Sequence, residues 1–256
     1  MVDWAELNLF FVILARMSGF VLFNPILGRQ GIPNLAKSGL IMVLSVTAAS
    51  MTEYRPPVPE TVLETAVIFL LEIALGYILG LTVNIFFYVP LLGGETIDSQ
   101  MGMSMGKTYD PASQSSVSVS ATLFNVLMML LFFAANGHHT LLRIMLCSGR
   151  VVPFGQVAFG PELYAAVVEL FVECTLMAVK LCMPILAAEL LGQMGMGILM
   201  KVIPQINIFV INIDLKVIIG LALELLLIAP FSEYLLKVEF DMLQALQRLL
   251  QVIGTS

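Results

Sequence analysis

The sequence predicts an all-α integral membrane protein built from long, kinked helices that pair as hairpins. Hydrophobic residues make up 59% of the 256 residues and charged residues only 12%, which is about half the roughly 25% of an ordinary soluble domain. Several apolar runs reach or exceed the ~20 residues that cross a bilayer as a helix. Prolines lie in or beside these runs, where each favours a kink or an end.

The same composition excludes several other classes of protein. A soluble protein of this size cannot hide so much apolar surface in one core, and a disordered chain needs few hydrophobic residues and high charge. The net charge is −6 and no basic run occurs, so no nucleic-acid-binding surface is predicted. Three cysteines without a CxxC motif predict packing rather than a disulfide framework.

The apolar runs, taken in chain order, give the first expected helices. Residues 7–27 are long enough to span a membrane, whereas residues 38–52 are apolar but short. Residues 62–92 form a run that is too long for one upright helix. Such a helix must tilt, kink or project out of the bilayer.

The second half of the chain continues this pattern. Residues 117–135 and 206–230 have the length of single spans, and residues 162–191 form another over-long run. Residues 231–253 interleave charged and apolar side chains, which predicts an amphipathic helix. The prolines expected to kink or end these helices are Pro90, Pro153, Pro184, Pro204 and Pro230.

Two stretches between the runs are predicted to be irregular. Residues 93–116 are rich in Gly and Ser and contain the Asp110-Pro111 pair, and residues 192–207 contain three glycines and a proline. Loops of this length are often functional. The residues expected to form a hinge in the second stretch are Gly192, Gly195, Gly197 and Pro204.

Charged residues also interrupt the apolar runs, and each costs roughly 2.5–3.5 kcal/mol at the centre of a bilayer. Two interpretations are open: a proton or ion relay, or ion pairs and hydrogen bonds that are buried in the chain or lie between subunits. We favour the second, because a relay gathers carboxylates at one depth and these are spread along the chain. The residues are Arg16, Glu72, Glu169, Glu173, Lys180, Asp214, Lys216 and Glu224. Three of them, Glu169, Glu173 and Lys180, share one helix face.

The methionine content of the sequence is also high, with 16 residues. Met101, Met103 and Met105 alternate with glycine and serine. Because methionine is flexible and polarizable, it fills irregular gaps in ordinary cores. In a Gly- and Ser-rich segment it can also seal a passage and deform around a passing chain, and the lack of helical periodicity favours this second interpretation.

No catalytic, cofactor-binding or metal-binding motif emerges, so the sequence predicts neither an enzyme nor a cofactor. The adjacent pair His138-His139 has no carboxylate or cysteine at ligand spacing. We therefore expect a turn-capping or interfacial role for it. Nucleophile, phosphate-binding and zinc-protease motifs are missing from the sequence.

Several short motifs, in order, resemble the FliR family of flagellar type III export-gate proteins. The most specific are GETIDSQMGMS at 94–104, NGH at 136–138 and PQINIFVI at 204–211. Asn24-Pro25-Ile26-Leu27 near the start and Ile228-Ala229-Pro230-Phe231 near the end add to them. Their order and spacing cover nearly the whole chain.

The resemblance implies a function and partners. Members of this family co-assemble with FliP- and FliQ-type proteins, as a hetero-oligomer, into a closed portal through which unfolded flagellar subunits are exported. An FlhB-type switch protein is a further implied partner. The implied location is the flagellar basal body in the bacterial inner membrane.

The resemblance also implies one export-gate domain over residues 1–256. Its parts would be N-terminal helices at 1–92, a plug loop at 93–116, middle helices at 117–191 and a C-terminal helical hairpin at 192–256. The implied plug residues are Met101, Gly102, Met103, Ser104, Met105, Gly106, Asp110 and Pro111. Residues implied to brace the plug or face the pore are Glu95, Asp98 and Gln100.

Two alternatives stay open at this point. One is an injectisome homologue of the same family. The other is a secondary transporter, because the interruptions near residues 93 and 192 could be the paired broken helices of two transporter halves.

Overall fold

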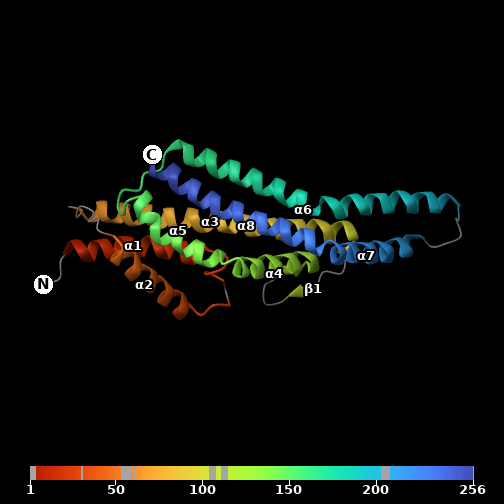
Figure 1. Ribbon diagram of the computed structural model, residues 1–256, viewed down its shortest axis with the longest axis horizontal. Helices are drawn as coiled ribbons and strands as arrows, with labels where there is room; N and C mark the ends of the chain where they lie inside the picture. Colours follow the sequence, from red (N-terminus) through yellow and green to blue (C-terminus); the bar gives the residue numbers. More distant parts are fainter. Residues whose placement is uncertain are drawn as a thin grey trace. The chain divides into compact units, whose positions relative to one another are not determined.

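The computed structural model describes residues 4–29, 31–52, 59, 61–103, 108–110, 115–202 and 208–255. Within these ranges the chain forms eight helices and one pair of short strands (Figure 1). The helices are α1 (Trp4–Phe23), α2 (Asn34–Ser50), α3 (Val62–Met101), α4 (Val119–Ala134), α5 (Gly137–Val151), α6 (Pro161–Val202), α7 (Ile208–Leu226) and α8 (Ile228–Gly254). The strands β1 (Thr108–Asp110) and β2 (Ser115–Val117) pair antiparallel. The prediction of an all-α membrane protein is confirmed, with this small hairpin as an addition.

By length and composition, three of the helices could cross a membrane. They are Glu6–Phe23 in α1, the whole of α3, and Pro161–Leu199 in α6. The pairs α4–α5 and α7–α8 each qualify as one interrupted span, which raises the number within the described residues to five. At 1.5 Å per residue, the 40 residues of α3 extend for about 60 Å. This is twice the ~30 Å of a hydrocarbon core.

The first predicted irregular stretch is largely helical, which corrects the prediction for residues 93–101. Helix α3 continues through Gly93 and Gly94 and ends at Met101. These glycines serve close helix packing, because a Cβ on Gly94 would lie 2.7 Å from the carbonyl carbon of Ser120 on α4. The predicted boundary at residue 92 therefore lies inside a helix.

The second predicted irregular stretch needs the same correction. Helix α6 has 42 residues and continues through Gly192, Gly195 and Gly197 to Val202. In apolar surroundings a helix keeps every backbone N–H and C=O paired, and this outweighs the ~1 kcal/mol that each glycine costs. The predicted boundary at residue 191 thus lies inside α6, and Pro204 lies outside the described residues.

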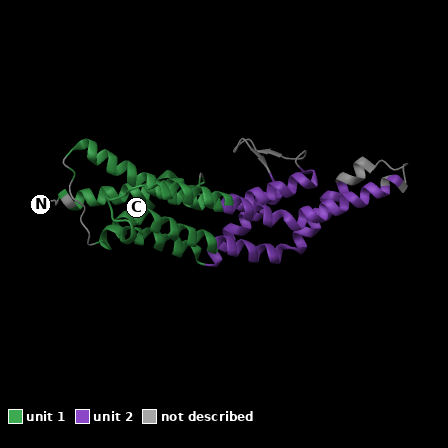
Figure 2. Ribbon diagram, turned by 90° about the horizontal axis from the view of Figure 1, so that it is seen from above, with its two compact units in different colours: residues 1–86, 136–172, 240–256 green, residues 87–135, 173–239 purple. Residues whose placement is uncertain are grey.

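The chain divides into two compact units, coloured green and purple in Figure 2. Unit 1 consists of residues 1–86, 136–172 and 240–256, and unit 2 of residues 87–135 and 173–239. Each unit therefore gathers segments that are distant in the sequence.

In unit 1, helix α1 packs against α2, and α2 also contacts α5. The C-terminal end of α8 meets the end of α5, since a Cβ on Gly254 would lie 2.6 Å from the carbonyl oxygen of Val151. The fully or almost fully buried side chains come from four helices. They include Ile13, Met17, Phe20, Leu75, Leu79, Leu141, Met145, Leu246 and Leu249.

Helices α1 and α3 approach each other very closely in unit 1. A Cβ on Gly76 would lie 2.7 Å from the backbone nitrogen of Phe20, and one on Gly19 would lie 3.2 Å from the carbonyl carbon of Ile73. Only glycine permits this backbone-to-backbone contact. The crossing positions Arg16 of α1 beside α3.

Unit 2 is held together by side chains of four helices. Phe87 of α3 meets Phe132 of α4 edge to face, and Phe124 of α4 meets Phe231 of α8 with ring centroids 5.2 Å apart. The Tyr234 hydroxyl of α8 donates a hydrogen bond of 3.1 Å to the carbonyl oxygen of residue 177 in α6.

The close crossing of α1 and α3 gives a direct test of the packing in unit 1. We expect Gly76→Val to lower the free energy of unfolding by about 1–3 kcal/mol, because the new side chain overlaps backbone that cannot move aside. Gly39→Val is the matched control, since Gly39 lies in α2 with nothing within 4 Å of its Cβ position. The measurement is denaturant unfolding in detergent, and equal losses in both variants would contradict this packing.

Candidate functional site

A buried polar cluster joins the end of α3 to the start of α4, and we name its three residues, Asp98, Ser118 and Ser120, the α3–α4 clasp. All three are buried, with Asp98 only 1% exposed. The Ser118 hydroxyl donates to Oδ2 of Asp98 at 2.6 Å, and the Ser120 hydroxyl donates to Oδ1. The backbone N–H of Ser120 also donates to Oδ2, at 3.3 Å.

Local sequence explains why α4 begins at the clasp. Ser118 has the extended backbone of an N-cap residue, and its hydroxyl oxygen accepts a hydrogen bond from the N–H of Ala121. Serine is a favoured N-cap because it pairs an amide that the helix leaves free. The Asp98 carboxylate then lies at the amino end of α4, where the helix dipole favours negative charge.

The other side of the clasp is the end of α3. Gly102 has a φ of +80°, which ends the helix in the left-handed conformation that favours glycine. Met101 is fully buried and packs on α7, since a Cβ on Gly220 would lie 2.6 Å from its Sδ atom. Both ends of the segment between α3 and α4 are therefore anchored in unit 2.

Glu224 of α7 lies one turn after Gly220, the residue on which Met101 packs. Glu224 is 3% exposed. Its Oε1 atom has no hydrogen-bond partner among the described residues.

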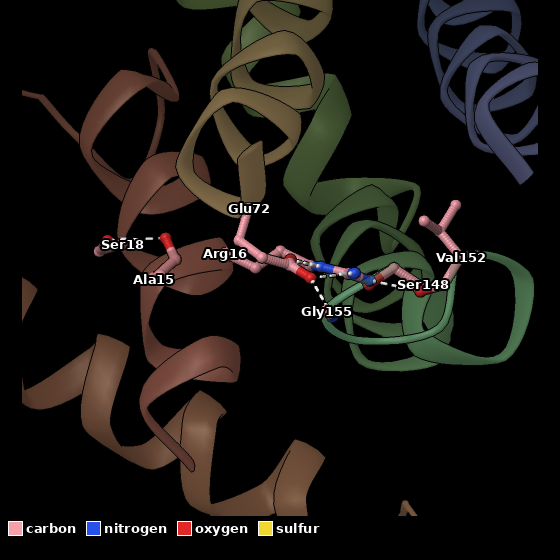
Figure 3. A network of polar contacts seen from close by, with 7 residues as sticks. All are labelled: Ala15, Arg16, Ser18, Glu72, Ser148, Val152 and Gly155. Carbon is pink, nitrogen blue, oxygen red and sulfur yellow. Dashed lines mark hydrogen bonds and ion pairs between the residues drawn. The ribbon is translucent and has the colours of Figure 1, made fainter. Parts of the chain in front are cut away.

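Unit 1 contains a second buried polar centre, the ion pair between Arg16 of α1 and Glu72 of α3 (Figure 3). Both side chains are 0% exposed. The guanidinium pairs through two atoms: Nε lies 2.5 Å from Oε2, and Nη2 lies 3.0 Å from Oε1. Such a bidentate pair is stronger and more specific in geometry than a single contact.

The rest of this ion pair is also satisfied by protein groups. Nη1 of Arg16 donates to the carbonyl oxygen of Val152 at 2.9 Å and to the Ser148 hydroxyl at 3.3 Å. The N–H of Gly155 donates to Oε1 of Glu72 at 2.7 Å. The guanidinium lies 4.3 Å from the ring centroid of Phe154. This centre therefore joins α1, α3, α5 and the segment that follows α5.

The structure places the predicted polar residues in three different settings. Arg16 and Glu72 pair with each other within the chain, and Asp98 forms the clasp. On the same helix as Asp98, Glu95 is exposed and Gln100 is half-buried. The remaining predicted charges, apart from buried Glu224, are exposed or half-buried: Glu169, Glu173, Lys180, Asp214 and Lys216.

The predicted plug residues are only partly within the described chain. Met101 is buried in α3, and Gly102 and Met103 are half-buried just after it. Asp110 lies in β1, paired in register with Ser115. Outside the described residues lie Ser104, Met105, Gly106 and Pro111.

Sequence analysis missed the groups that complete both polar centres. Ser118 could have been found, because a serine just before an apolar run is an N-cap signal. Ser120, Ser148 and Gly155 carry no such signal. Among the described residues, no group of three or more His, Cys, Asp or Glu side chains is arranged to hold a metal ion.

These features together define the class of protein: an all-helical membrane protein with buried polar centres between its helices. Residues 7–242 match the model of the family described as bacterial export proteins, family 1. The chain belongs to this family.

Individual relatives agree with the family match. The chain is 30% identical over 245 residues to the flagellar biosynthetic protein FliR of Escherichia coli (strain K12), covering 93% of this chain and 92% of the relative. It is 28% identical to the protein of the same name from Pectobacterium carotovorum subsp. carotovorum, over 95% of this chain and 93% of the relative. The corresponding Bacillus subtilis (strain 168) protein is 24% identical, with 96% of both chains covered.

The Arg16–Glu72 pair can be tested with a double-mutant cycle. We expect Arg16→Met alone, or Glu72→Leu alone, to lower the free energy of unfolding by roughly 3–5 kcal/mol, because each leaves a buried charge without its partner. The double variant should lose clearly less than the sum of the two. Denaturant unfolding in detergent measures all four proteins.

Arg150→Met is the matched control for this cycle, because Arg150 is an exposed arginine at the end of α5. We expect a change within about 0.5 kcal/mol for this surface position. Additive losses at Arg16 and Glu72 would show that the two charges do not depend on each other.

Proposed function

We propose that this chain is a subunit of the flagellar type III protein-export gate. The observation that carries the proposal is the likeness, over nearly the full length, to proteins named flagellar biosynthetic protein FliR. Each of these three relatives is flagellar, which favours the flagellar gate over an injectisome.

The surface of α6 supports a role within an assembly. Glu169, Glu173 and Lys180 are exposed on a helix whose neighbouring apolar residues, such as Phe171 and Leu176, are exposed as well. Charged groups on a spanning helix are costly when they face lipid. We propose that FliP- and FliQ-type proteins cover this face and that an FlhB-type protein contacts the assembly, in the bacterial inner membrane at the flagellar basal body.

We further propose that the segment from Met101 to Pro111 is the plug of the gate and that unfolded flagellar subunits displace it. Two features support this role. The segment has the Met, Gly and Ser composition of a deformable seal. Described residues on either side hold the chain: Met101 at the start of the segment is buried, and Ser118, further along, donates a hydrogen bond to Asp98.

The first experiment is co-purification from the native membrane through a tag at residue 256, followed by mass spectrometry. We expect FliP- and FliQ-type proteins in a complex of defined size. If the chain purifies alone as a single species, the proposed export-gate function is contradicted. Solute uptake by that species would then support the transporter alternative.

A charge variant locates the contact within the same experiment. Glu173→Lys should reduce the recovery of partners and leave the unfolding of the chain itself unchanged, because Glu173 is exposed in the isolated chain. The comparison is Glu6→Lys, an exposed acidic residue of α1. Equal recovery of partners with both variants would remove α6 from the proposed interface.

The plug is tested by changing the residue that ends α3. We expect Gly102→Ala to reduce export of flagellar subunits or to make the membrane leaky to ions, because alanine at a φ of +80° costs about 1–2 kcal/mol. Gly195→Ala is the matched control, since Gly195 is helical with nothing within 4 Å of its Cβ position. Motility and ion leakage are measured at equal protein levels, and normal values in Gly102→Ala would contradict the plug.

A further inference from the structure

A hollow with a volume of about 430 Å³ lies between α5 and the last turns of α8, within unit 1 (green in Figure 2). Two buried side chains, Ile144 and Leu250, give it apolar surface. Four exposed polar side chains also line it: Thr140 and Arg143 of α5, and Gln247 and Gln251 of α8. Its volume is within the range of sites that bind small molecules.

The four polar side chains of the hollow are free to bind a ligand. None of them has a hydrogen bond or an ion pair with another residue in the part of the chain that the structure describes. Guanidinium, amide and hydroxyl groups can all donate hydrogen bonds. No carboxylate lines the hollow, so the one charged group that faces a ligand there is the guanidinium of Arg143.

The sequence around the hollow is basic, although the chain as a whole is acidic. The net charge of the chain is −6, with 18 acidic residues. None of these acidic residues lies between residues 111 and 161 or after residue 241, yet the same two segments contain Arg143, Arg150 and Arg248. An anion is therefore the ligand that this charge distribution favours.

Both helices of the hollow belong to candidate membrane spans. Helix α5 is part of the interrupted span α4–α5, and α8 is part of the interrupted span α7–α8. An arginine in such a segment is unfavourable unless water or an anion accompanies it. Long arginine side chains reach toward the interface of the bilayer, which is where the phosphate groups of lipids lie.

We propose that this hollow binds the headgroup of an anionic phospholipid. The planar guanidinium of Arg143 matches a phosphate group and donates two parallel hydrogen bonds to it. Thr140, Gln247 and Gln251 donate to the other oxygens of the headgroup. The adjoining part of the acyl chains covers the apolar surface of Ile144 and Leu250.

The size of the hollow favours a lipid headgroup over a helix of a partner protein. A helix with its side chains is 10–12 Å wide and rises 5.4 Å per turn, so one turn occupies roughly the whole volume of the hollow. Docking of a helix needs a groove that continues over several turns. A compact phosphate ester with an apolar tail fits a short hollow that combines donors with apolar surface.

Cys147 provides a direct measurement of occupancy, because it lines the hollow and is a half-buried free cysteine. The other two cysteines, Cys174 and Cys182, are buried. The purified full-length protein is treated with N-ethylmaleimide in detergent, and alkylation of each cysteine is followed by mass spectrometry of its peptides. We expect phosphatidylglycerol to slow alkylation of Cys147, and phosphatidylcholine with the same acyl chains to leave the rate unchanged.

Variants of the polar side chains test the role of Arg143. Arg143→Gln should raise the phosphatidylglycerol concentration for half-protection about tenfold, because it removes a charged donor. The matched control is Arg150→Gln, since Arg150 lies about 10 Å further along α5, beyond the screening length of about 8 Å at physiological salt. Thr140→Glu, at an exposed position, should abolish protection because the new carboxylate repels the phosphate.

Several outcomes would overturn the lipid site. They are equal protection of Cys147 by the two lipids, no protection by either, and unchanged protection in Arg143→Gln. Protection by glycerol 3-phosphate without lipid would show that the ligand is a soluble phosphate ester. Protection that requires accompanying proteins and no phosphatidylglycerol would show that a partner covers the hollow.

The lipid site goes beyond the proposed export function and does not rest on it. Recovery of FliP- and FliQ-type proteins and protection of Cys147 are separate measurements. Failure to recover partners would leave the lipid dependence of alkylation intact, and a lipid-independent rate would leave the export-gate proposal intact.

Discussion

The buried ion pair between Arg16 and Glu72 is the interaction on which unit 1 depends. A guanidinium and a carboxylate that are both fully buried are stable only if every donor and acceptor finds a partner, and here three helices and the segment after α5 provide them. The pair also requires α1 and α3 to lie nearly backbone to backbone. Gly76 makes that approach possible one turn after Glu72 on α3.

Unit 2 repeats the same arrangement on the second half of α3. Asp98 follows Gly94 by one turn, so both lie on one face of the helix. Gly94 lets the start of α4 come close, and Asp98 accepts hydrogen bonds from the two serines that this approach delivers. At two places along α3, an acidic residue lies one turn from a glycine, and the two residues together hold a neighbouring helix: α1 at the first place and α4 at the second. The glycine removes the steric barrier, and the carboxylate makes the contact specific because only a hydrogen-bonded partner offsets its desolvation.

This arrangement explains where sequence analysis succeeded and where it failed. The apolar runs predicted the helices, because the need to pair every backbone group in apolar surroundings decides their secondary structure. The predictions at residues 93–101 and 192–202 fail because glycine, a loop signal in soluble proteins, does not break a helix in apolar surroundings. Gly94 is a contact surface for α4, whereas Gly192, Gly195 and Gly197 have nothing within 4 Å of their Cβ positions among the described residues. Arg16 and Glu72 were identified by the cost of burying them. Their pairing was not, because 56 residues separate them and nothing local links the two positions.

The charged residues of this chain therefore fall into two groups with different physical roles. Arg16, Glu72 and Asp98 are compensated within the chain and determine how its helices pack. The charges on the exposed face of α6 contribute nothing comparable to the packing of either unit, yet they are expensive against lipid. A sequence keeps such charges at a spanning helix when a partner or water completes them. Within one chain, burial thus separates the polar groups that determine how the helices pack from the charges that stay exposed on α6.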